Sequence, residues 1–217
     1  MNIVILGPQG SGKDTQAEKI AVHFNLERVN MGNFLREVAK QDTPLGKEIY
    51  EYQNTKGAMV PSRILKEVLG IKINSFPREQ SIAFEGVPRT MEQAQYFDEA
   101  VKESGRKIDK VVYIKISKEE TLKRISKRRV CKSCEKILIM GKDIESESEK
   151  CPDCGGEIVL RIDDTDEVIA KRLKVFQDET IPVIDYYKKQ GKLLEVDGAQ
   201  SIEEVFGDIL VELKSVA

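Results

Sequence analysis

Short apolar runs alternate with longer amphipathic stretches along the chain. The apolar runs cover residues 2–6, 27–29, 81–85, 111–116 and 192–196 and predict strands. Between them, apolar residues recur at helical spacing over residues 13–24, 31–40, 44–55, 61–73, 90–103, 118–128, 164–189 and 201–214. Strands that alternate with helices predict an α/β fold on a parallel sheet, which binds ligands at the carboxyl ends of its strands.

Polar residues at the ends of these patterns support the helix boundaries. Thr90 and Ser201 stand where N-caps belong, and Ser62 and Ser117 are also suited to begin helices. Pro182 falls inside the long pattern at 164–189. Because proline lacks the amide hydrogen that a helix interior uses, we expect it to kink or divide that helix.

The most informative segment is residues 7–15, GPQGSGKDT, between the first strand and the first helix. Strand, glycine-rich loop, lysine and helix form the context of a phosphate-binding loop. Glycines let several backbone N–H groups point at one anion, the helix adds its positive N-terminal end, and Lys13 supplies a charge for the outer phosphates. The alternative is a glycine-rich turn that only links a strand to a helix.

Asp14 departs from the usual pattern of such loops, in which Ser or Thr directly follows the lysine. An acid near phosphates is unexpected, because like charges repel. We therefore expect the Asp14 carboxylate to point outward or sideways, while its backbone N–H serves the phosphate.

A second candidate site is residues 84–90, FEGVPRT. Glu85 ends a predicted strand beside the glycine loop and is suited to hold Mg²⁺ through water. Gly86 lets a ligand approach the backbone, and Arg89 opens the next helix, where its guanidinium can bind a phosphate. Taken alone, the segment is about equally well explained as a strand–turn–helix with a salt bridge.

The four cysteines lie in a polar segment, residues 130–160, which predicts an inserted module. Cys131 and Cys134 form one CxxC pair, and Cys151 and Cys154 form a second pair, separated from the first by 16 residues. Tetrahedral zinc is the default metal for four such thiolates, and a site filled by four protein ligands is structural. Redox CxxC pairs, buried free thiols and a four-sulfur iron site are the alternatives.

Composition narrows the class of protein. The chain has 217 residues, of which 40% are hydrophobic, which fits one large domain or one domain with inserts. A net charge of −2 gives no overall basic surface for nucleic acid. We see no signal peptide and no run of membrane-span length, and we expect a cytoplasmic protein in which CxxC pairs bind metal rather than form disulfides.

The order and content of these motifs resemble the adenylate kinase family in its long-lid, zinc-bearing form, over essentially the whole chain. The resemblance rests on residues 7–15, on GNFLR at 32–36, GAMVP at 57–61, EGVPRT at 85–90, the arginines at 124, 128, 161 and 172, and VDG at 196–198. It implies a P-loop NTPase-like, parallel five-stranded sheet flanked by helices. The implied core is 1–30, 61–126 and 165–217, with a helical AMP-binding segment at 31–60 and a zinc-ribbon-like lid at 127–164.

The resemblance also implies a reaction: reversible, Mg²⁺-dependent phosphoryl transfer from ATP to AMP, giving two ADP. The residues implied for catalysis are Lys13, Arg89, Arg124, Arg128, Arg161 and Arg172. Those implied for ATP are Gly10, Ser11, Gly12, Lys13, Asp14, Thr15, Arg124, Arg128, Ile137, Leu138 and Gln200, with Glu85 holding Mg²⁺ through water. Those implied for AMP are Met31, Arg36, Ala58, Met59, Val60, Gly86, Val87, Pro88, Arg89, Gln93, Arg161 and Arg172. The expected partners are these small nucleotides, without nucleic acid or membrane, and the expected state is a monomer.

Several positions depart from the family pattern. Asp14 stands where the family normally has Gly, and Glu85 replaces an Asp. Val87 replaces a Phe, and Met31 stands where a Thr usually lies near the AMP base. Residues 137 and 138, Ile and Leu, stand where related lids often carry a polar residue and a Tyr near the ATP base. None of these changes removes a charge needed for transfer, but those at 31, 137 and 138 bear on base selectivity.

Three other functions remain open from the sequence. A related nucleoside-monophosphate kinase would accept UMP or CMP, or use GTP as donor; Gln93, where the family reads the adenine edge, and the long lid favour AMP. A zinc-ribbon nucleic-acid-binding ATPase would use the basic residues beside the cysteines, but the acidic run at 143–149 and the few aromatic residues oppose it. A non-catalytic nucleotide sensor would bind ATP without transferring phosphate.

Overall fold

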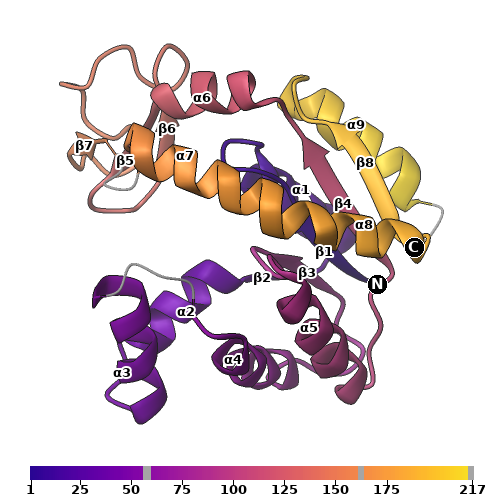
Figure 1. Ribbon diagram of the computed structural model, residues 1–217. Helices are drawn as coiled ribbons and strands as arrows, with labels where there is room; N and C mark the ends of the chain where they lie inside the picture. The colour runs from indigo at the N-terminus through magenta and orange to yellow at the C-terminus, as the bar shows by residue number, and fades with distance from the viewer. Residues whose placement is uncertain (56–59, 161–163, 215–217) are drawn as a thin grey trace.

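A parallel sheet of five strands organises the fold, in the order β2-β3-β1-β4-β8 (Figure 1). The strands are β1 (Asn2–Leu6), β2 (Glu27–Asn30), β3 (Ile82–Glu85), β4 (Lys110–Lys115) and β8 (Leu193–Asp197). The structure is a computed structural model and describes residues 1–55, 60–160 and 164–214. The predicted α/β fold with a parallel five-stranded sheet is therefore confirmed.

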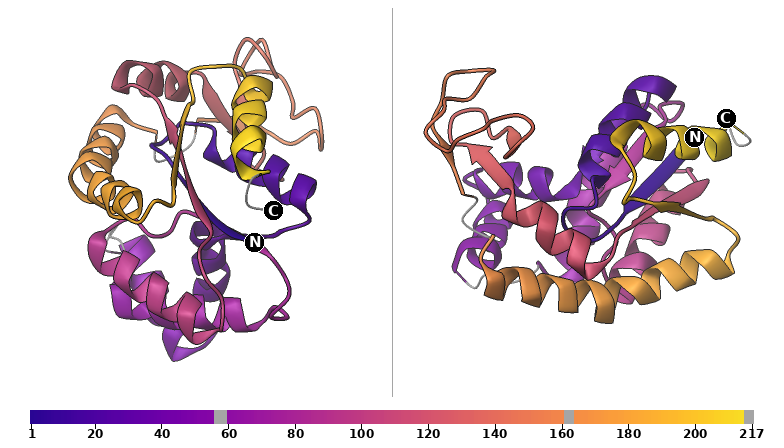
Figure 2. Two further views of the ribbon diagram at one scale, coloured as in Figure 1. Left: turned by 90° about the vertical axis from the view of Figure 1, so that its right-hand side faces the viewer. Right: turned by 90° about the horizontal axis from the view of Figure 1, so that it is seen from above.

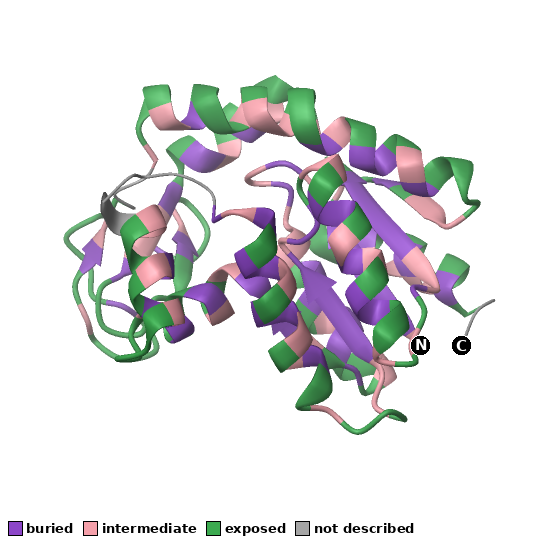
Figure 3. Ribbon diagram, turned by 60° about the horizontal axis from the view of Figure 1, so that its bottom comes forward, coloured by how far each residue is buried: buried purple, intermediate pink, exposed green. Residues whose placement is uncertain are grey.

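Alternate residues of β1 face two separate hydrophobic layers. Ile3 and Ile5 belong to the layer formed with α1 (Lys13–Phe24) and α9 (Ile202–Leu213). Val4 and Leu6 belong to the layer formed with α2 (Met31–Ala39), α4 (Ser62–Asn74), α5 (Met91–Glu103) and α8 (Ile181–Lys189). A strand buried on both faces is continuously apolar, which explains the unbroken run of β1. Figure 3 shows these strands buried between the helices.

The segment between β2 and α4 is a helical excursion from the sheet. Asn30 caps α2 by accepting a hydrogen bond from the backbone N–H of Asn33, and Thr43 caps α3 (Pro44–Tyr50) through Gly46 in the same way. A π-helical turn, η1 (Glu51–Thr55), follows α3. The predicted helix over 44–55 is thus present, with its last turn in π geometry.

A small antiparallel sheet, in the order β6-β5-β7, lies beyond the end of α6 (Lys118–Ser126) and apart from the main sheet (Figures 1 and 2). Its strands are β5 (Arg128–Cys131), β6 (Ile137–Ile139) and β7 (Ile158–Val159). We call residues 127–160 the small module. Its core consists of Cys131, Leu138, Ile144, Cys151 and Ile158. The predicted helix over 118–128 was two residues too long, because Arg128 already pairs with Ile139 in this sheet.

The long pattern at 164–189 is divided as Pro182 predicted. It forms α7 (Asp166–Val175), a π-helical turn η2 (Phe176–Thr180) and α8, and Pro182 lies in the first turn of α8. Proline is tolerated there because a first-turn N–H has no partner within the helix. Thr90, Ser117 and Ser201 are N-caps, whereas Ser62 is the first residue of α4. Within the described ranges, every helix is too short or too polar to cross a membrane.

Candidate functional site

The loop after β1 has the backbone shape that an anion requires. Gly10 and Gly12 have φ angles of 79° and 84°, a region in which glycine is favoured. A Cβ atom on Gly7 would lie 2.8 Å from the carbonyl oxygen of Ile114, so the loop packs closely against the end of β4. Helix α1 begins at Lys13, and the first N–H groups of a helix have no intrahelical partners. Loop and helix together offer an anion site at the carboxyl end of the sheet.

Lys13 lies among charged groups from several elements. Loss of hydration on burial lowers the pKa of its ammonium, and the charges of Glu85 and Asp14 oppose this shift. The guanidinium groups of Arg89 and Arg128 lower the pKa further. The cations gathered around this half-buried lysine favour an anionic ligand, because each gains by pairing with negative charge.

A second set of cations surrounds Arg89. Although the Arg89 side chain is exposed, the surrounding protein displaces part of its hydration and lowers its pKa, and the nearby charges of Arg172 and Arg36 add to this shift. The Nε of Arg89 donates to the carbonyl oxygen of Gly86 at 3.0 Å. Arg36 is held by the side-chain oxygen of Asn33. The structure therefore brings three of the predicted arginines together.

The predicted magnesium ligand, Glu85, ends β3 with its side chain 3% exposed. Burial raises the pKa of this carboxyl, and the neighbouring charge of Asp14 raises it further. Arg28 opposes both effects by donating to Glu85 Oε2 at 2.8 Å. The Asp14 side chain turns sideways toward Arg28 on β2, as expected from the sequence.

The residues implied for the AMP base fall into two groups. Gln93 Oε1 accepts a hydrogen bond from the backbone N–H of Arg89 at 2.9 Å, which fixes the orientation of the Gln93 amide. The side chains of Met31, Val60 and Val87 are 1%, 7% and 0% exposed and belong to one hydrophobic cluster. These apolar side chains pack into the core.

The small module brings one predicted arginine to the phosphate loop. Arg128 Nε donates to Asp164 Oδ2 at 2.7 Å, and its Nη2 donates to Asp164 Oδ1. Gln9 Nε2 in the phosphate loop donates to the same carboxylate at 2.9 Å. Arg161, Ala58 and Met59, which the resemblance also implied, lie outside the described residues.

Arg124 has a different environment from Arg128. Its Nη1 donates to the carbonyl oxygen of Gly10 at 3.3 Å and its Nη2 to that of Gly198 at 2.8 Å, while Glu120 accepts from its Nε at 2.7 Å. Arg124 thus ties the phosphate loop to the loop after β8, which contains Gln200. The Gln200 amide donates to the Asp197 carbonyl oxygen at 3.1 Å.

The two residues implied for the ATP base occupy β6. Leu138 is fully buried in the core of the small module, and Ile137 is 39% exposed. The Leu138 side chain therefore packs within the module, whereas the Ile137 side chain is open to solvent.

The four cysteine sulfurs lie within 4.8 Å of one another. The Sγ atoms of Cys131 and Cys154 are 3.4 Å apart, and those of Cys134 and Cys151 are 3.7 Å apart. A tetrahedral site with metal–sulfur bonds of about 2.3 Å has sulfur–sulfur distances of about 3.8 Å, so these residues fit a four-thiolate metal site. The backbone N–H of Cys134 donates to Cys131 and is the main reason that the pKa of the Cys131 thiol falls to about 6, whereas the pKa values of the Cys134 and Cys154 thiols are raised by the neighbouring sulfurs.

Sequence reasoning did not single out Arg28, Asn30 or Gln9. Arg28 and Asn30 lie on β2, which pairs in parallel with β3 so that Asn30 stands beside Glu85. Polar residues at the carboxyl end of a strand were the available signal, since such residues meet at one edge of a parallel sheet. To place Arg28 and Asn30 beside Glu85, however, one must know that β2 pairs with β3, and the sequence did not show this strand order.

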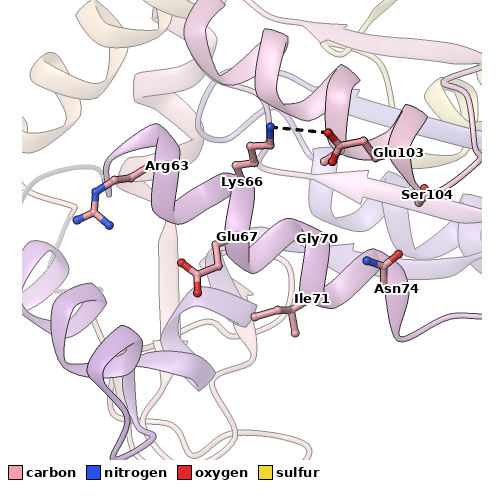
Figure 4. Close-up of a pocket in the computed structure, with 9 residues that line it drawn as sticks. Arg63, Lys66, Glu67, Gly70, Ile71, Asn74, Glu103 and Ser104 are labelled. Carbon is pink, nitrogen blue, oxygen red and sulfur yellow. Dashed lines mark ion pairs between the residues drawn. The ribbon is translucent and has the colours of Figure 1, made fainter.

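A hollow of about 380 Å³ lies between α4 and α5, away from the phosphate loop (Figure 4). It is open and lined largely by charged or polar side chains, among them Arg63 and Glu67, and Lys66 pairs across it with Glu99 at 3.0 Å and Glu103 at 4.0 Å. None of the residues that the sequence singled out lines this hollow. The candidate site is therefore the one around the phosphate loop.

Comparison with known proteins identifies the family of the chain. The sequence model of the adenylate kinase family matches residues 5–192. An adenylate kinase from Archaeoglobus fulgidus is 37% identical over 216 residues, which cover 100% of this chain and 99% of that protein. Adenylate kinases from Methanothrix thermoacetophila and Syntrophobacter fumaroxidans are 40% and 38% identical over 209 residues, covering 96% of this chain and 96% and 98% of theirs. The chain therefore belongs to the adenylate kinase family.

Proposed function

We propose that this chain catalyses the reversible transfer of a phosphoryl group from Mg·ATP to AMP, giving two ADP, at the carboxyl ends of β1, β3 and β4. The observation that carries the proposal is the convergence of Lys13, Arg89 and Arg128 beside a glycine loop at a helix N-terminus. Arg36 and Arg172 extend this positive region on the side of α2 and α7. One continuous positive site suits two phosphate-bearing substrates.

The attacking group in this reaction is a phosphate oxygen of AMP that is already ionised, so no general base is required. Catalysis then consists of positioning and charge stabilisation. We assign the β- and γ-phosphates of ATP to Lys13 and the loop amides, and the AMP phosphate to Arg36 and Arg89. The remaining arginines implied for catalysis, Arg124, Arg128, Arg161 and Arg172, would close over the transferring group.

Glu85 would hold Mg²⁺ through water, because its carboxylate ends β3 within the electrostatic reach of Lys13. When bound, Mg²⁺ would neutralise part of the negative charge on the phosphates. Arg28 and Asn30 keep the Glu85 carboxylate in place by donating to its Oε2. Gln93, oriented by Arg89, would read the adenine edge of AMP.

We propose three functional parts for the chain: a core of residues 1–30, 61–126 and 165–217, an AMP-binding segment at 31–60, and a lid at 127–164. The second and third parts would close over the core to exclude water, since ATP is otherwise hydrolysed. The four cysteines would hold a structural Zn²⁺ in the lid. The sulfur chemistry also favours a reducing, cytoplasmic location, and we expect a monomer.

Product analysis tests the proposed reaction. Purified protein is incubated with Mg·ATP and, in turn, AMP, UMP, CMP and GMP, with GTP as an alternative donor. We expect rapid ADP formation with ATP and AMP. Transfer to a pyrimidine monophosphate would assign a related kinase, for which the buried Met31 in place of Thr is the motivating observation. Nucleotide binding without transfer to any acceptor would overturn the proposal and leave a nucleotide sensor.

A further inference from the structure

Two carboxylates from different elements share one pair of donors beside the phosphate loop. Arg28 Nη2 donates to Glu85 Oε2 at 2.8 Å and also to Asp14 Oδ1. The Asn30 amide donates to the same two oxygens, at 3.1 Å for Glu85 and 3.3 Å for Asp14. Arg28 and Asn30 are two residues apart on β2, so both side chains lie on one face of the strand. The first turn of α1, the end of β3 and the edge strand β2 therefore meet in one polar cluster.

The negative charges of the two carboxylates in this cluster must be balanced by a cation. Asp14 and Glu85 place two negative charges close to Lys13, where the phosphates of ATP would bind. Glu85 is 3% exposed, so water does little to screen it, whereas the Asp14 side chain is 49% exposed. Like charges in such a place repel each other and an incoming triphosphate. Arg28 is the cation that directly bonds both carboxylates, and it is 29% exposed.

The cluster also reaches the proposed AMP-binding segment. Asn30, which shares the two carboxylates with Arg28, accepts at its Oδ1 from the backbone N–H of Asn33 at 2.9 Å and so caps α2. That helix carries Arg36, whose guanidinium is held by the Asn33 side chain. The position of the Glu85 carboxylate is thereby connected to the start of α2.

We propose that Arg28 is a positioning residue of the Mg·ATP site: it neutralises Asp14 and holds the Glu85 carboxylate, so that the phosphate loop of this chain functions with an acid next to Lys13. This inference rests on the proposed function. It assigns Asp14 and Arg28 as a compensating pair, in which the acid that departs from the family pattern is balanced by an arginine from the neighbouring strand. Without Arg28, Asp14 repels the triphosphate and displaces Glu85.

A structural role is the rival explanation, because β2 is the edge of the sheet and an ion pair can attach it to α1. The two roles make different predictions. If the ion pair is structural, removing either Arg28 or Asp14 should lower the melting temperature. A positioning residue changes the affinity for Mg·ATP and the Mg²⁺ concentration needed for turnover, and removing Asp14 should then relieve much of the loss.

The test is a double-mutant cycle with Arg28→Gln, Asp14→Asn and the double variant. Each protein is assayed for the KM of Mg·ATP, the KM of AMP, kcat, the free Mg²⁺ concentration at half-maximal rate and Tm. Lys19→Gln is the matched control, since it removes a cation that pairs α1 with Glu203 away from the phosphate loop. Binding of Mg²⁺ with a non-hydrolysable ATP analogue is measured by calorimetry for the parent and for each variant.

We expect Arg28→Gln to raise the KM of Mg·ATP and the half-maximal Mg²⁺ concentration roughly tenfold or more, the effect of losing a charge-assisted hydrogen bond, with a smaller change in the KM of AMP. When Asp14→Asn is already present, adding Arg28→Gln should raise the KM of Mg·ATP and the half-maximal Mg²⁺ concentration about threefold or less. Arg28→Lys, which restores one charge without the fork, should recover part of the loss. Lys19→Gln should match the parent.

Equal effects of Arg28→Gln in both backgrounds, or a fall in Tm with unchanged Mg²⁺ dependence, would overturn the proposal in favour of a structural pair. Failure of the proposed function is distinguishable, because it would appear as absence of transfer by the parent protein. In that case the calorimetric cycle still decides the coupling, since it measures binding of the nucleotide analogue and not turnover. If the effect of Arg28→Gln on the affinity for the nucleotide analogue differed by less than threefold between the parent protein and the Asp14→Asn variant, the positioning role would also be excluded.

Discussion

The guanidinium of Arg128 is paired with the carboxylate of Asp164, with Nε donating to Oδ2 over 2.7 Å. The carboxylate is 1% exposed, and it also accepts from Gln9 in the phosphate loop at 2.9 Å. Asp164 therefore connects β5 of the small module to the loop that begins α1. A carboxylate in this place fixes the direction of the guanidinium, whose flat fork suits a phosphoryl group as well as a carboxylate.

Arg128→Ala should lower kcat by on the order of 10³, because an arginine that neutralises charge on a transferring phosphoryl group contributes at least that much. The variant also leaves the buried Asp164 carboxylate without its cation, so we expect some loss of stability as well. Steady-state kinetics at saturating ATP and AMP, with Tm measured in parallel, separates the two effects.

Lys132→Ala is the control for this variant. Lys132 lies next to the end of β5 in the same module, is 56% exposed and pairs with Glu157 at 2.9 Å. Exposed ion pairs contribute about 1 kcal/mol or less, so its kcat should stay close to that of the parent. Near-normal turnover of Arg128→Ala would show that this arginine does not contact the reacting phosphate.

Glu85→Gln should separate stability from activity. The pKa of Glu85 is raised because its carboxyl is buried and lies beside Asp14. A group whose pKa is higher in the folded protein stabilises the fold below its unfolded pKa, about 4.3, and loses that contribution as the pH rises through the folded value. Above the folded pKa the ionised Glu85 therefore lowers the stability of the fold, and Glu85→Gln should raise the Tm of the nucleotide-free protein there by a few degrees.

The same substitution should lower turnover, because an amide replaces the carboxylate proposed to hold Mg²⁺ through water. Tm is measured for both proteins from pH 4 to pH 8, with no Mg²⁺ or nucleotide present. The difference should shrink as the pH falls toward the ordinary range of glutamate. A lower Tm for Glu85→Gln across the whole range would mean that the bond to Arg28 outweighs the cost of burying the charge.

Local patterns predicted much of this fold because each element carries its own signal. The continuous apolar run of β1 and the glycine loop before Lys13 identified a strand, a turn and a helix within a few residues of their observed bounds. The division of the helix before Pro182 followed from the chemistry of one residue. Boundaries were less exact where two structures compete, as at Arg128, which the helical pattern included but β5 uses.

Contacts between distant segments were beyond local patterns. Arg28 bonds Glu85, 57 residues away, only because β2 lies beside β3 in the sheet. Gln9 bonds Asp164 across 155 residues because the segment just before α7 lies beside the phosphate loop. The burial of the Met31 side chain in the core likewise depends on distant segments, since the surrounding helices and strands determine what packs there.

Met31→Thr should reduce stability more than it changes selectivity. The Met31 side chain is 1% exposed within the cluster that also contains Val87 and Leu35. Shortening a buried methionine and adding a hydroxyl should cost about 2–4 kcal/mol in the free energy of unfolding, whereas Met31→Leu should cost less than about 1.5 kcal/mol. Urea unfolding of the three proteins measures these differences. A change in the preference for AMP over UMP with little loss of stability would instead place residue 31 at the base.

Removing the metal should loosen the small module. Cys131 and Cys151 are buried in its core together with Leu138, and all four sulfurs converge. Structural zinc sites contribute on the order of 10 kcal/mol to the folding of small modules, so a strong chelator should lower Tm by at least several degrees. Elemental analysis of the purified protein identifies the metal and distinguishes zinc from iron.

Cys151→Ser supplies the control for chelation, since it removes one ligand while leaving the residues around Lys13 in place. The chelator should lower the Tm of the parent but have little further effect on Cys151→Ser, which excludes an action through Mg²⁺ or through the chelator itself. Kinetics at low temperature should show a smaller loss for Cys151→Ser than for Arg128→Ala, because the cysteine acts through the fold of the module. An unchanged melting curve after complete removal of metal would mean that the module folds by its hydrophobic core alone.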